Sequence, residues 1–312
     1  MAAGPMGGRR IWYPNGSLGV QVFFRRCARR LVQRNWQREK EEVAIDTAAF
    51  VGTHDVLMLV LDTLRYDVAR DCLAAGRTPH LAAMLPGGAW EARQTPGSFT
   101  LAAHAAFFAG FLPTPARPGR HPRPFAVRFP GSETATEATA IFDAPDIVSG
   151  FAGRGYHTLC VGGVGFFNKL SPLGSMLPGL FAESVWKPEF GVTDPDSTAN
   201  QVRWTVTRLR ELPRERRAFL FLNVSALHQP NRFYLPGATE DTLESHAAAL
   251  EYVDRQLPPL FAALRERGPS FCVVCSDHGT AYGEGGYTGH RLAHEVVWTV
   301  PYAEFVLPGS EP

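Results

Sequence analysis

Three short and almost uninterrupted apolar runs constrain the fold of this 312-residue chain more than any other feature. They lie at residues 56–61, 219–224 and 271–275. Runs of this length without polar alternation are typical of strands that helices cover on both faces, as in parallel sheets. Segments with helical spacing lie between them. The sequence therefore predicts an α/β fold with a mostly parallel central sheet and helices on both faces.

Further strands and helices follow from the same patterns. Additional strands are expected at residues 90–94, 156–161 and 302–307. Helices are expected at residues 64–75, 101–108, 143–154, 197–212 and 239–267, the last of these broken or kinked at Pro258. The sequence contains no repeats and no sign of a second core, so residues 51–312 are predicted to form one domain.

Residues 1–50 differ from the rest of the chain. Within them, residues 20–42 alternate arginines with apolar side chains, a pattern that indicates a basic amphipathic helix. We therefore expect a basic N-terminal extension that is partly helical or disordered. Two roles stay open for it: contact with a membrane surface or a partner, and a solvated face laid on the domain.

Charge, hydropathy and cysteine content limit the partners and the cellular location that can be expected. The net charge is only +1, which does not predict a nucleic-acid partner. No stretch approaches the roughly 20 apolar residues of a membrane span, so no transmembrane segment is expected. The chain has five cysteines, an odd number, and four of them lie in apolar surroundings. Buried, reduced thiols are typical of the cytosol, so the predicted location is cytoplasmic.

Polar residues follow the three apolar runs, where each strand is expected to end. Asp62 follows the first run, His228 comes shortly after the second, and Asp277 and His278 follow the third. Because the carboxyl ends of parallel strands lie at one edge of a sheet, these side chains are expected to converge. Carboxylates and imidazoles are natural metal ligands. Asp62 as an N-cap and His228 as an ordinary loop histidine are the simpler readings, but together the residues favour a site.

These segments resemble the alkaline phosphatase superfamily, and within it the sulfatase-like hydrolases. The stretches that carry the resemblance are VLMLVLDTLRYD, FLFLNVSALHQP, FCVVCSDHG and GHRLAHEVVWTVP. The resemblance implies that Asp62, Asp277 and His278 bind a metal ion. It also implies that His228 contacts the transferred group. His290 falls where sulfatases place a substrate-binding lysine, so both histidines are candidate catalytic residues.

A nucleophile is implied by the stretch SFTLAAHAAFFAGFLP. In the family, the nucleophile opens a helix that ends in a glycine, with a proline three residues further on. Counting back from Gly110 and Pro113 leads to Thr100, which the resemblance makes both nucleophile and metal ligand. A hydroxyl at a helix N-terminus also faces the positive end of the helix dipole. Two alternatives stay open: Thr100 is merely an N-cap, or Ser98 is the nucleophile.

Four further residues are candidate substrate ligands. His104, one helical turn after Thr100, stands where sulfatases carry an arginine; packing is its alternative role. Arg65, Asn168 and Lys169 fall on loops near the same sheet edge in the predicted topology. Arg65 has the alternative of a structural ion pair with a neighbouring aspartate.

The sequence also departs from the sulfatase pattern. Positions for the formylglycine precursor, a second aspartate, a lysine and a histidine hold Thr100, Thr63, Gly163 and Gly165. A threonine nucleophile instead resembles the phosphodiesterase and phosphotransferase branches. An aspartate of the two-zinc members is replaced by Val224, which implies one metal ion per chain. The ligand set suits Zn²⁺ or Mn²⁺, with Mg²⁺ and Ca²⁺ as alternatives.

The resemblance implies a metal-dependent hydrolase of small phosphate mono- or diesters. In this hypothesis Thr100 attacks phosphorus and forms a covalent phospho-enzyme. One alternative is a sulfuric-ester or phosphonate hydrolase. An alternative of another class is a catalytically degenerate binding protein with the same fold.

Overall fold

The structure, a computed structural model, describes residues 49–109 and 146–310. The expected N-terminal extension lies almost entirely outside these residues. From Ala49 onwards the chain forms one compact unit. Among the described helices, none is both long and apolar enough to span a bilayer. The four cysteines of the described part are buried and free, as expected, and the cytoplasmic location stays a prediction.

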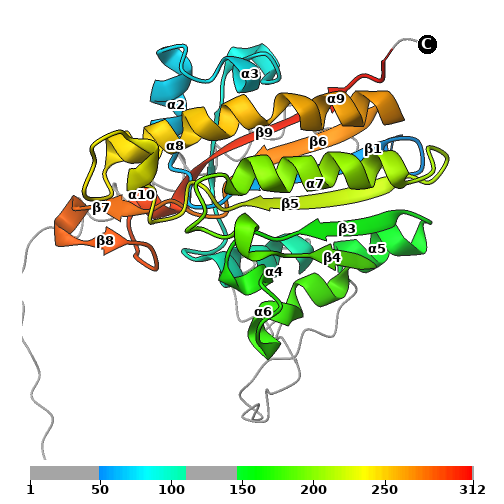
Figure 1. The fold of residues 1–312 in the computed structure, drawn as a ribbon, viewed down its shortest axis with the longest axis horizontal. Coiled ribbons are helices and arrows are strands. Elements are labelled where there is room, and N and C mark those ends of the chain that lie inside the picture. Colours follow the sequence, from blue (N-terminus) through cyan, green and yellow to red (C-terminus); the bar gives the residue numbers. More distant parts are fainter. Residues whose placement is uncertain (1–48, 110–145, 311–312) are drawn as a thin grey trace, which may run out of the picture. The chain divides into compact units, whose positions relative to one another are not determined.

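A seven-stranded sheet forms the centre of the molecule, in the order β2-β9-β6-β1-β5-β3-β4 (Figure 1). The strands are β1 (Asp55–Leu61), β2 (Glu91–Gln94), β3 (His157–Val161), β4 (Glu183–Val185), β5 (Ala218–Val224), β6 (Ser270–Cys275) and β9 (Thr299–Leu307). Strands β6, β1, β5, β3 and β4 are mutually parallel, whereas β9 pairs antiparallel with β6 and with β2. The predicted α/β fold with a mostly parallel sheet is therefore confirmed. A separate two-stranded ribbon consists of β7 (Ala281–Tyr282) and β8 (Thr288–Gly289).

Each predicted helix is present to within a few residues, and three short helices, α3, α6 and α10, were not predicted. They are α2 (Tyr66–Ala74), α3 (Pro79–Ala82), α4 (Thr100–Ala109), α5 (Ile147–Gly153), α6 (Pro172–Met176), α7 (Ser197–Glu211), α8 (Leu243–Gln256), α9 (Pro258–Arg267) and α10 (Glu295–Trp298). The expected break at Pro258 separates α8 from α9 because proline lacks the N–H that would continue the helix. Helix α5 begins later than expected, after Asp146, whose side chain caps it by accepting from the Ser149 N–H.

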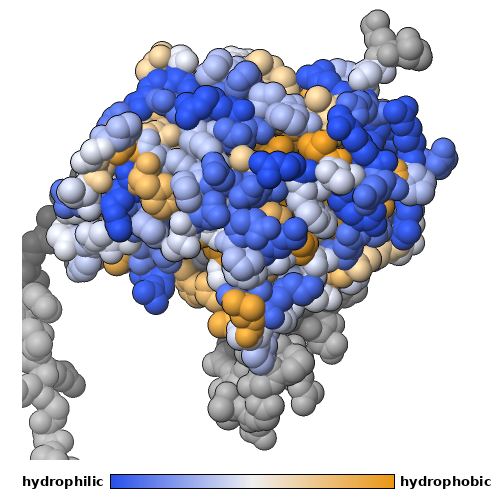
Figure 2. Space-filling model, in the orientation of Figure 1, coloured by the Kyte–Doolittle hydropathy of each residue, from blue (hydrophilic) through white to orange (hydrophobic). Residues whose placement is uncertain are grey.

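The two faces of the sheet are packed with different side chains. On one face, leucines and valines of the paired strands β1 and β5 belong to the same core as apolar residues of α7, α8 and α9. These helices lie in front of the sheet in Figure 1. On the opposite face, Phe221 packs edge-on against Phe108 of α4, and Phe151 of α5 packs against Phe219. The outer surface in front, over α7 and α8, is mainly hydrophilic (Figure 2). Helix α4 is thus held on the aromatic face, with its first residue near the carboxyl ends of the strands.

Candidate metal centre and active site

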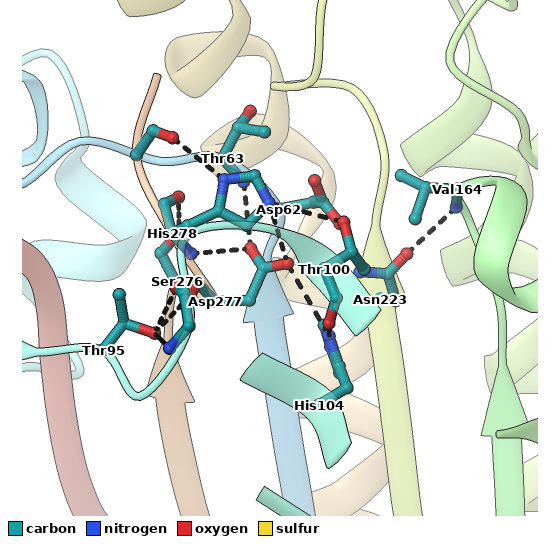
Figure 3. A network of polar contacts seen from close by, with 12 residues as sticks. Asp62, Thr63, Thr95, Thr100, His104, Val164, Asn223, Ser276, Asp277 and His278 are labelled. Atoms are coloured by element: carbon teal, nitrogen blue, oxygen red, sulfur yellow. Dashed lines mark hydrogen bonds and ion pairs between the residues drawn. The ribbon is translucent and has the colours of Figure 1, made fainter. Parts of the chain in front are cut away.

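Two carboxylates and an imidazole meet at the carboxyl edge of the sheet (Figure 3). Asp62 directly follows β1, and Asp277 and His278 come after the neighbouring strand β6. One ligand atom from each of the three residues lies within 4.8 Å of the other two, and all three side chains are fully buried. The structure thus brings Asp62 together with two residues that lie more than 200 positions further along the sequence, as the strand-end argument expects.

The carboxylates of this cluster are only half satisfied. Asp277 Oδ1 accepts hydrogen bonds from the backbone N–H groups of Thr63 (3.1 Å) and His278 (3.0 Å). No described residue hydrogen-bonds Asp277 Oδ2 or Asp62 Oδ1, although both atoms are buried. Burial raises the pKa of Asp62 to about 7, with the neighbouring Asp277 as the second cause. Burial likewise raises the pKa of Asp277 to about 7. A divalent cation between these oxygens would remove both costs, so the residues present fit a metal ion.

A hydrogen bond to one ring nitrogen of His278 leaves the other nitrogen free to bind a metal ion. Its Nδ1 donates to the Gly279 carbonyl oxygen at 2.9 Å, which leaves the lone pair on Nε2. This Nε2 lies 3.4 Å from Asp277 Oδ2 and 3.4 Å from the Thr100 hydroxyl. Burial also lowers the pKa of His278, which favours the neutral form that binds metals. An imidazole fixed through one nitrogen and free at the other is the usual arrangement of a metal-binding histidine.

Thr100 joins this cluster from the aromatic face of the sheet. It is the first residue of α4 and is almost fully buried. The chain before α4 approaches closely because Gly97 has no side chain: a Cβ there would lie 2.5 Å from the Ala103 nitrogen. Ser98 lies two residues before the helix and is partly exposed, and its carbonyl oxygen accepts from the Arg291 N–H at 2.8 Å. Of the two candidate nucleophiles, Thr100 is the one in hydrogen-bonding distance of a cluster residue.

Two further imidazoles stand beside the cluster. The ring of His290 lies 4.6 Å from that of His278, and the ring of His228 lies 5.5 Å from that of His290. Thr100, His228 and His290 all line one cavity of about 310 Å³. Burial, followed by the neighbouring imidazoles of His278 and His228, lowers the pKa of His290 to about 3. An anion in the cavity would favour protonation of the His290 ring.

His104 lies inside the protein rather than on the cavity. Its Nδ1 donates to the Thr100 carbonyl oxygen at 2.8 Å, and its ring packs edge-on against Phe167 and Phe221. It is fully buried, and burial lowers its pKa to about 3. This geometry supports the packing alternative over the expected substrate contact. Through Asp277 Oδ2, 3.7 Å away, His104 still belongs to the surroundings of the cluster.

The three loop candidates for substrate binding are engaged elsewhere. Arg65 is buried in ion pairs with Asp67 and Glu284, which is the structural alternative considered for it. Lys169 donates from Nζ to the carbonyl and hydroxyl oxygens of Ser184 at 3.0 Å. The Asn168 side chain accepts from the Leu170 N–H at 2.9 Å and packs against Gly174. These contacts hold loops in place, and they leave the three side chains without a described contact to the metal-binding cluster.

Asn223 is a residue that the sequence analysis missed. It lies on β5, and its Nδ2 donates to Asp62 Oδ2 at 3.0 Å (Figure 3). Its Oδ1 accepts from the Val164 N–H at 3.0 Å, on the loop that lines the cavity. The signal in the sequence is a polar amide inside an otherwise apolar run. The structure shows that this amide is fully buried, and a buried amide needs specific hydrogen-bond partners. Asn223 therefore holds one oxygen of Asp62 in place and leaves the other, Oδ1, without a described hydrogen-bond partner.

The position one residue later bears on the number of metal ions. Val224 is fully buried and belongs to the hydrophobic core. Within the described residues, the cluster of Asp62, Asp277 and His278 is the only group of three potential ligands that lie close enough to share an ion. The expectation of one ion per chain, and of His228 and His290 as residues that contact the substrate, stays a prediction.

Comparison with known proteins finds similar folds among solved structures. No protein-family model matches the sequence, and no curated protein sequence does. Among solved structures, the C-terminal periplasmic domain of phosphoethanolamine transferase EptC from Campylobacter jejuni matches with a TM-score of 0.55 and 16% identity, over 81% of this chain and 80% of that one. A protein in the alkaline phosphatase superfamily from Vibrio parahaemolyticus also matches, with a TM-score of 0.52 and 16% identity, over 82% of this chain and 61% of that one. The chain therefore shares the fold of these proteins.

A second transferase gives the same result. The soluble domain of lipooligosaccharide phosphoethanolamine transferase A from Neisseria meningitidis matches with a TM-score of 0.55 and 16% identity, over 81% of this chain and 77% of that one. The family resemblance read from the sequence is thus confirmed at the level of the fold. Sequence identities this low carry no assignment of activity, which depends on the site itself.

Proposed function

We propose that this chain is a metal-dependent enzyme that hydrolyses phosphate esters through Thr100. The observation that carries the proposal is the placement of the Thr100 hydroxyl at the start of a helix, 3.4 Å from His278 Nε2. That nitrogen also lies 3.4 Å from Asp277 Oδ2, a buried carboxylate oxygen without a described hydrogen-bond partner. A hydroxyl in that position has a cation site on one side and a cavity on the other. This combination suits nucleophilic attack on a bound phosphate ester.

The residues that would hold the metal ion are Asp62, Asp277, His278 and the Thr100 hydroxyl. When bound, a divalent ion such as Zn²⁺ or Mn²⁺ neutralises charge on the phosphate and lowers the pKa of a hydroxyl beside it. The donor set of two carboxylate oxygens and one imidazole nitrogen supports either ion. A structure of the EptC periplasmic domain from Escherichia coli was solved as a zinc complex.

The chain's own residues then account for the two steps. In the first, Thr100 Oγ1 gives its proton to His228 or His290, which line the cavity with it, and forms a bond to phosphorus while the bond from phosphorus to the leaving oxygen breaks. The same imidazole then passes that proton to the leaving oxygen. In the second step, water gives a proton to this imidazole and attacks phosphorus, and Thr100 Oγ1 leaves phosphorus and takes the proton. The N-terminal N–H groups of α4 are oriented to bind phosphate oxygens in both steps.

A second candidate function is transfer of the phosphoryl group to an alcohol instead of water. The structural matches named as phosphoethanolamine transferases favour it, since the first step on Thr100 is the same and only the acceptor differs. A sulfuric-ester hydrolase is less well supported. Gly163 and Gly165 stand where sulfatases carry cations, and a Cβ on Gly163 would lie 2.4 Å from the Asn223 carbonyl oxygen, so that position has no room for a side chain.

Trapping the phospho-enzyme tests this proposal. The protein is incubated with Mn²⁺ or Zn²⁺ and with aryl phosphate mono- and diesters or an aryl sulfate, quenched in acid, and analysed by peptide mass spectrometry. Phosphate on Thr100, its absence in Thr100→Val, and its persistence in Ser98→Ala are the expected results. Turnover that survives a chelator, or full activity of Thr100→Val, would contradict the proposal. Release of phosphate in water, compared with transfer to added alcohols, separates hydrolysis from transfer.

A further inference from the structure

The lining of the cavity beside Thr100 consists of two kinds of side chain. Thr100, His228 and His290 are the groups beside which the phosphate would lie. The volume of about 310 Å³ is at the lower limit of small-molecule sites, so the cavity has room for more than a phosphate group. The remaining lining residues therefore determine which organic group an ester can carry.

Apolar side chains dominate these remaining residues. Val164 and Phe166 come from the loop after β3, Leu173 from α6, and Val192 from the segment before α7. Among the described residues that line the cavity, none is a lysine, arginine, aspartate or glutamate. Two basic residues lie close to the lining in sequence: Lys169, whose Nζ binds Ser184, and Arg291, which follows His290 and is exposed.

The apolar lining continues onto the surface at α6. Leu173 is 36% exposed, and Leu170, three residues before it, is 74% exposed. Figure 2 shows an apolar patch over the part of the molecule that carries α6. Large exposed leucines next to a cavity are a feature of binding surfaces more than of inert surface. A chain longer than the cavity would thus meet apolar side chains on leaving it.

We infer that this cavity binds the organic group of the phosphate ester and that this group is an uncharged alkyl or aryl group. The inference deepens the proposed function and rests on it for the identity of the reaction. Two physical reasons carry it: apolar groups gain free energy in an apolar cavity, and a charged group placed there would lose water without finding a counter-charge. The substrate class is therefore a lipid-like or aromatic phosphate ester rather than an amino- or carboxyl-bearing one.

Binding of phosphonates tests this without turnover, because enzymes of phosphate-ester chemistry leave the C–P bond intact. Calorimetry on the metal-loaded full chain would compare methyl-, butyl- and octylphosphonate with 2-aminoethyl- and 2-carboxyethylphosphonate. We expect affinity to rise by about twofold to fourfold for each methylene that enters the cavity. Leu173→Asn and Phe166→Ser should weaken octylphosphonate and leave methylphosphonate within about twofold. Leu243→Asn, at an exposed leucine outside this cavity, is the matched control.

Equal affinity for methyl- and octylphosphonate would overturn the inference, as would tighter binding of either charged phosphonate. Failure of all five phosphonates to bind would also overturn it. The proposed function fails separately: chain-length-dependent binding together with no turnover of any phosphate ester would support the apolar subsite and contradict the hydrolase. Turnover with no preference for apolar esters would do the reverse.

Discussion

The two ends of β1 carry two buried aspartates with opposite surroundings. Asp55, at the amino end, pairs with Arg267 at 2.8 Å through Oδ2, and its Oδ1 accepts from the Ala218 N–H at 2.8 Å. Asp62, just past the carboxyl end, has the Asn223 amide on Oδ2 and no described hydrogen-bond partner on Oδ1. Both side chains are fully buried. The Asp55 carboxylate is complete, in the sense that both of its oxygens have partners within the protein. The Asp62 carboxylate is incomplete, because one of its oxygens has no partner among the described residues.

This difference separates a structural charge from a functional one. The guanidinium of Arg267 also donates to backbone carbonyl oxygens at the end of α7, including that of Leu212 at 3.0 Å, so the Asp55 pair fastens α7 and α9 to the sheet. Asp62 has a second buried carboxylate, Asp277, as its neighbour, which makes its charge more costly still. A protein retains such a pair where a cation is to be bound, and its stability without the cation is lower for it.

The largest expected effect comes from neutralising the incomplete carboxylate. Asp62→Asn should lower kcat/KM on an aryl phosphate by about 10³-fold or more, because it removes a ligand of the ion that stabilises the transition state. The metal-free form of the same variant should be at least as stable as the wild-type protein, since a buried repulsion is lost. Steady-state kinetics and urea unfolding check both halves. Near-normal kcat/KM in Asp62→Asn would remove the functional half of the comparison.

Breaking the complete pair should affect folding instead. Arg267→Met leaves Asp55 buried without its cation and should lower the free energy of unfolding by about 3–5 kcal/mol. Arg210→Met is the matched control, because Arg210 pairs with Glu266 on the exposed surface, where solvent screens the pair, and its loss should cost far less. Urea unfolding measures both variants. If Arg267→Met lowers the free energy of unfolding no more than Arg210→Met does, the Asp55 pair does not have the structural role assigned to it.

The incomplete site also predicts how stability depends on pH. In the metal-free protein the pKa values of Asp62 and Asp277 are raised to about 7 from 3.8. Between pH 4 and 7 the folded state then holds protons that the unfolded state has lost, so stability falls as pH rises. Each carboxyl contributes a slope of up to about 1.4 kcal/mol per pH unit. Thermal unfolding of the metal-free protein should show this decline. Asp62→Asn should flatten it, and an unchanged slope in that variant would count against the assignment.

The smallest expected effect concerns the amide that orients Asp62. Asn223→Ala should weaken metal binding by about 10- to 100-fold, the range found when the hydrogen-bond partner of a metal ligand is removed. Asn200→Ala, at a partly buried asparagine of α7 that bonds the Glu189 carbonyl oxygen, is the control. Competition with a fluorescent chelator would give both affinities. Equal affinities in the two variants would assign Asn223 a purely structural role.

The fold could be predicted from the sequence because its signals are local. Uninterrupted apolar runs identify strands buried on both faces, and helical spacing identifies the covering helices. The sequence analysis missed β4, which has three residues, lies at the edge of the sheet and is only partly buried. A strand that short carries almost no periodicity, and its pairing with β3 is a tertiary choice.

The site could be predicted only in part, for a related reason. Convergence of Asp62 with Asp277 follows from topology, because their strands are parallel neighbours. The partners of polar side chains do not follow from topology. Arg65 finds Glu284, 219 positions away, and Lys169 finds Ser184, so neither is left for a substrate. In the sequence, Asn223 is a single polar residue within an apolar run. Its contact with Asp62 joins two strands and cannot be read from either strand alone.

Metal content tests the central claim most directly. The protein and its variants would be equilibrated with Zn²⁺ or Mn²⁺, dialysed, and analysed for metal per chain. We predict close to one ion in the wild-type protein and in Asp254→Asn, whose buried carboxylate already accepts from two backbone N–H groups. Asp62→Asn and Asp277→Asn should retain none. A full equivalent of metal in either of these two variants, or none in the wild-type protein, would contradict the account.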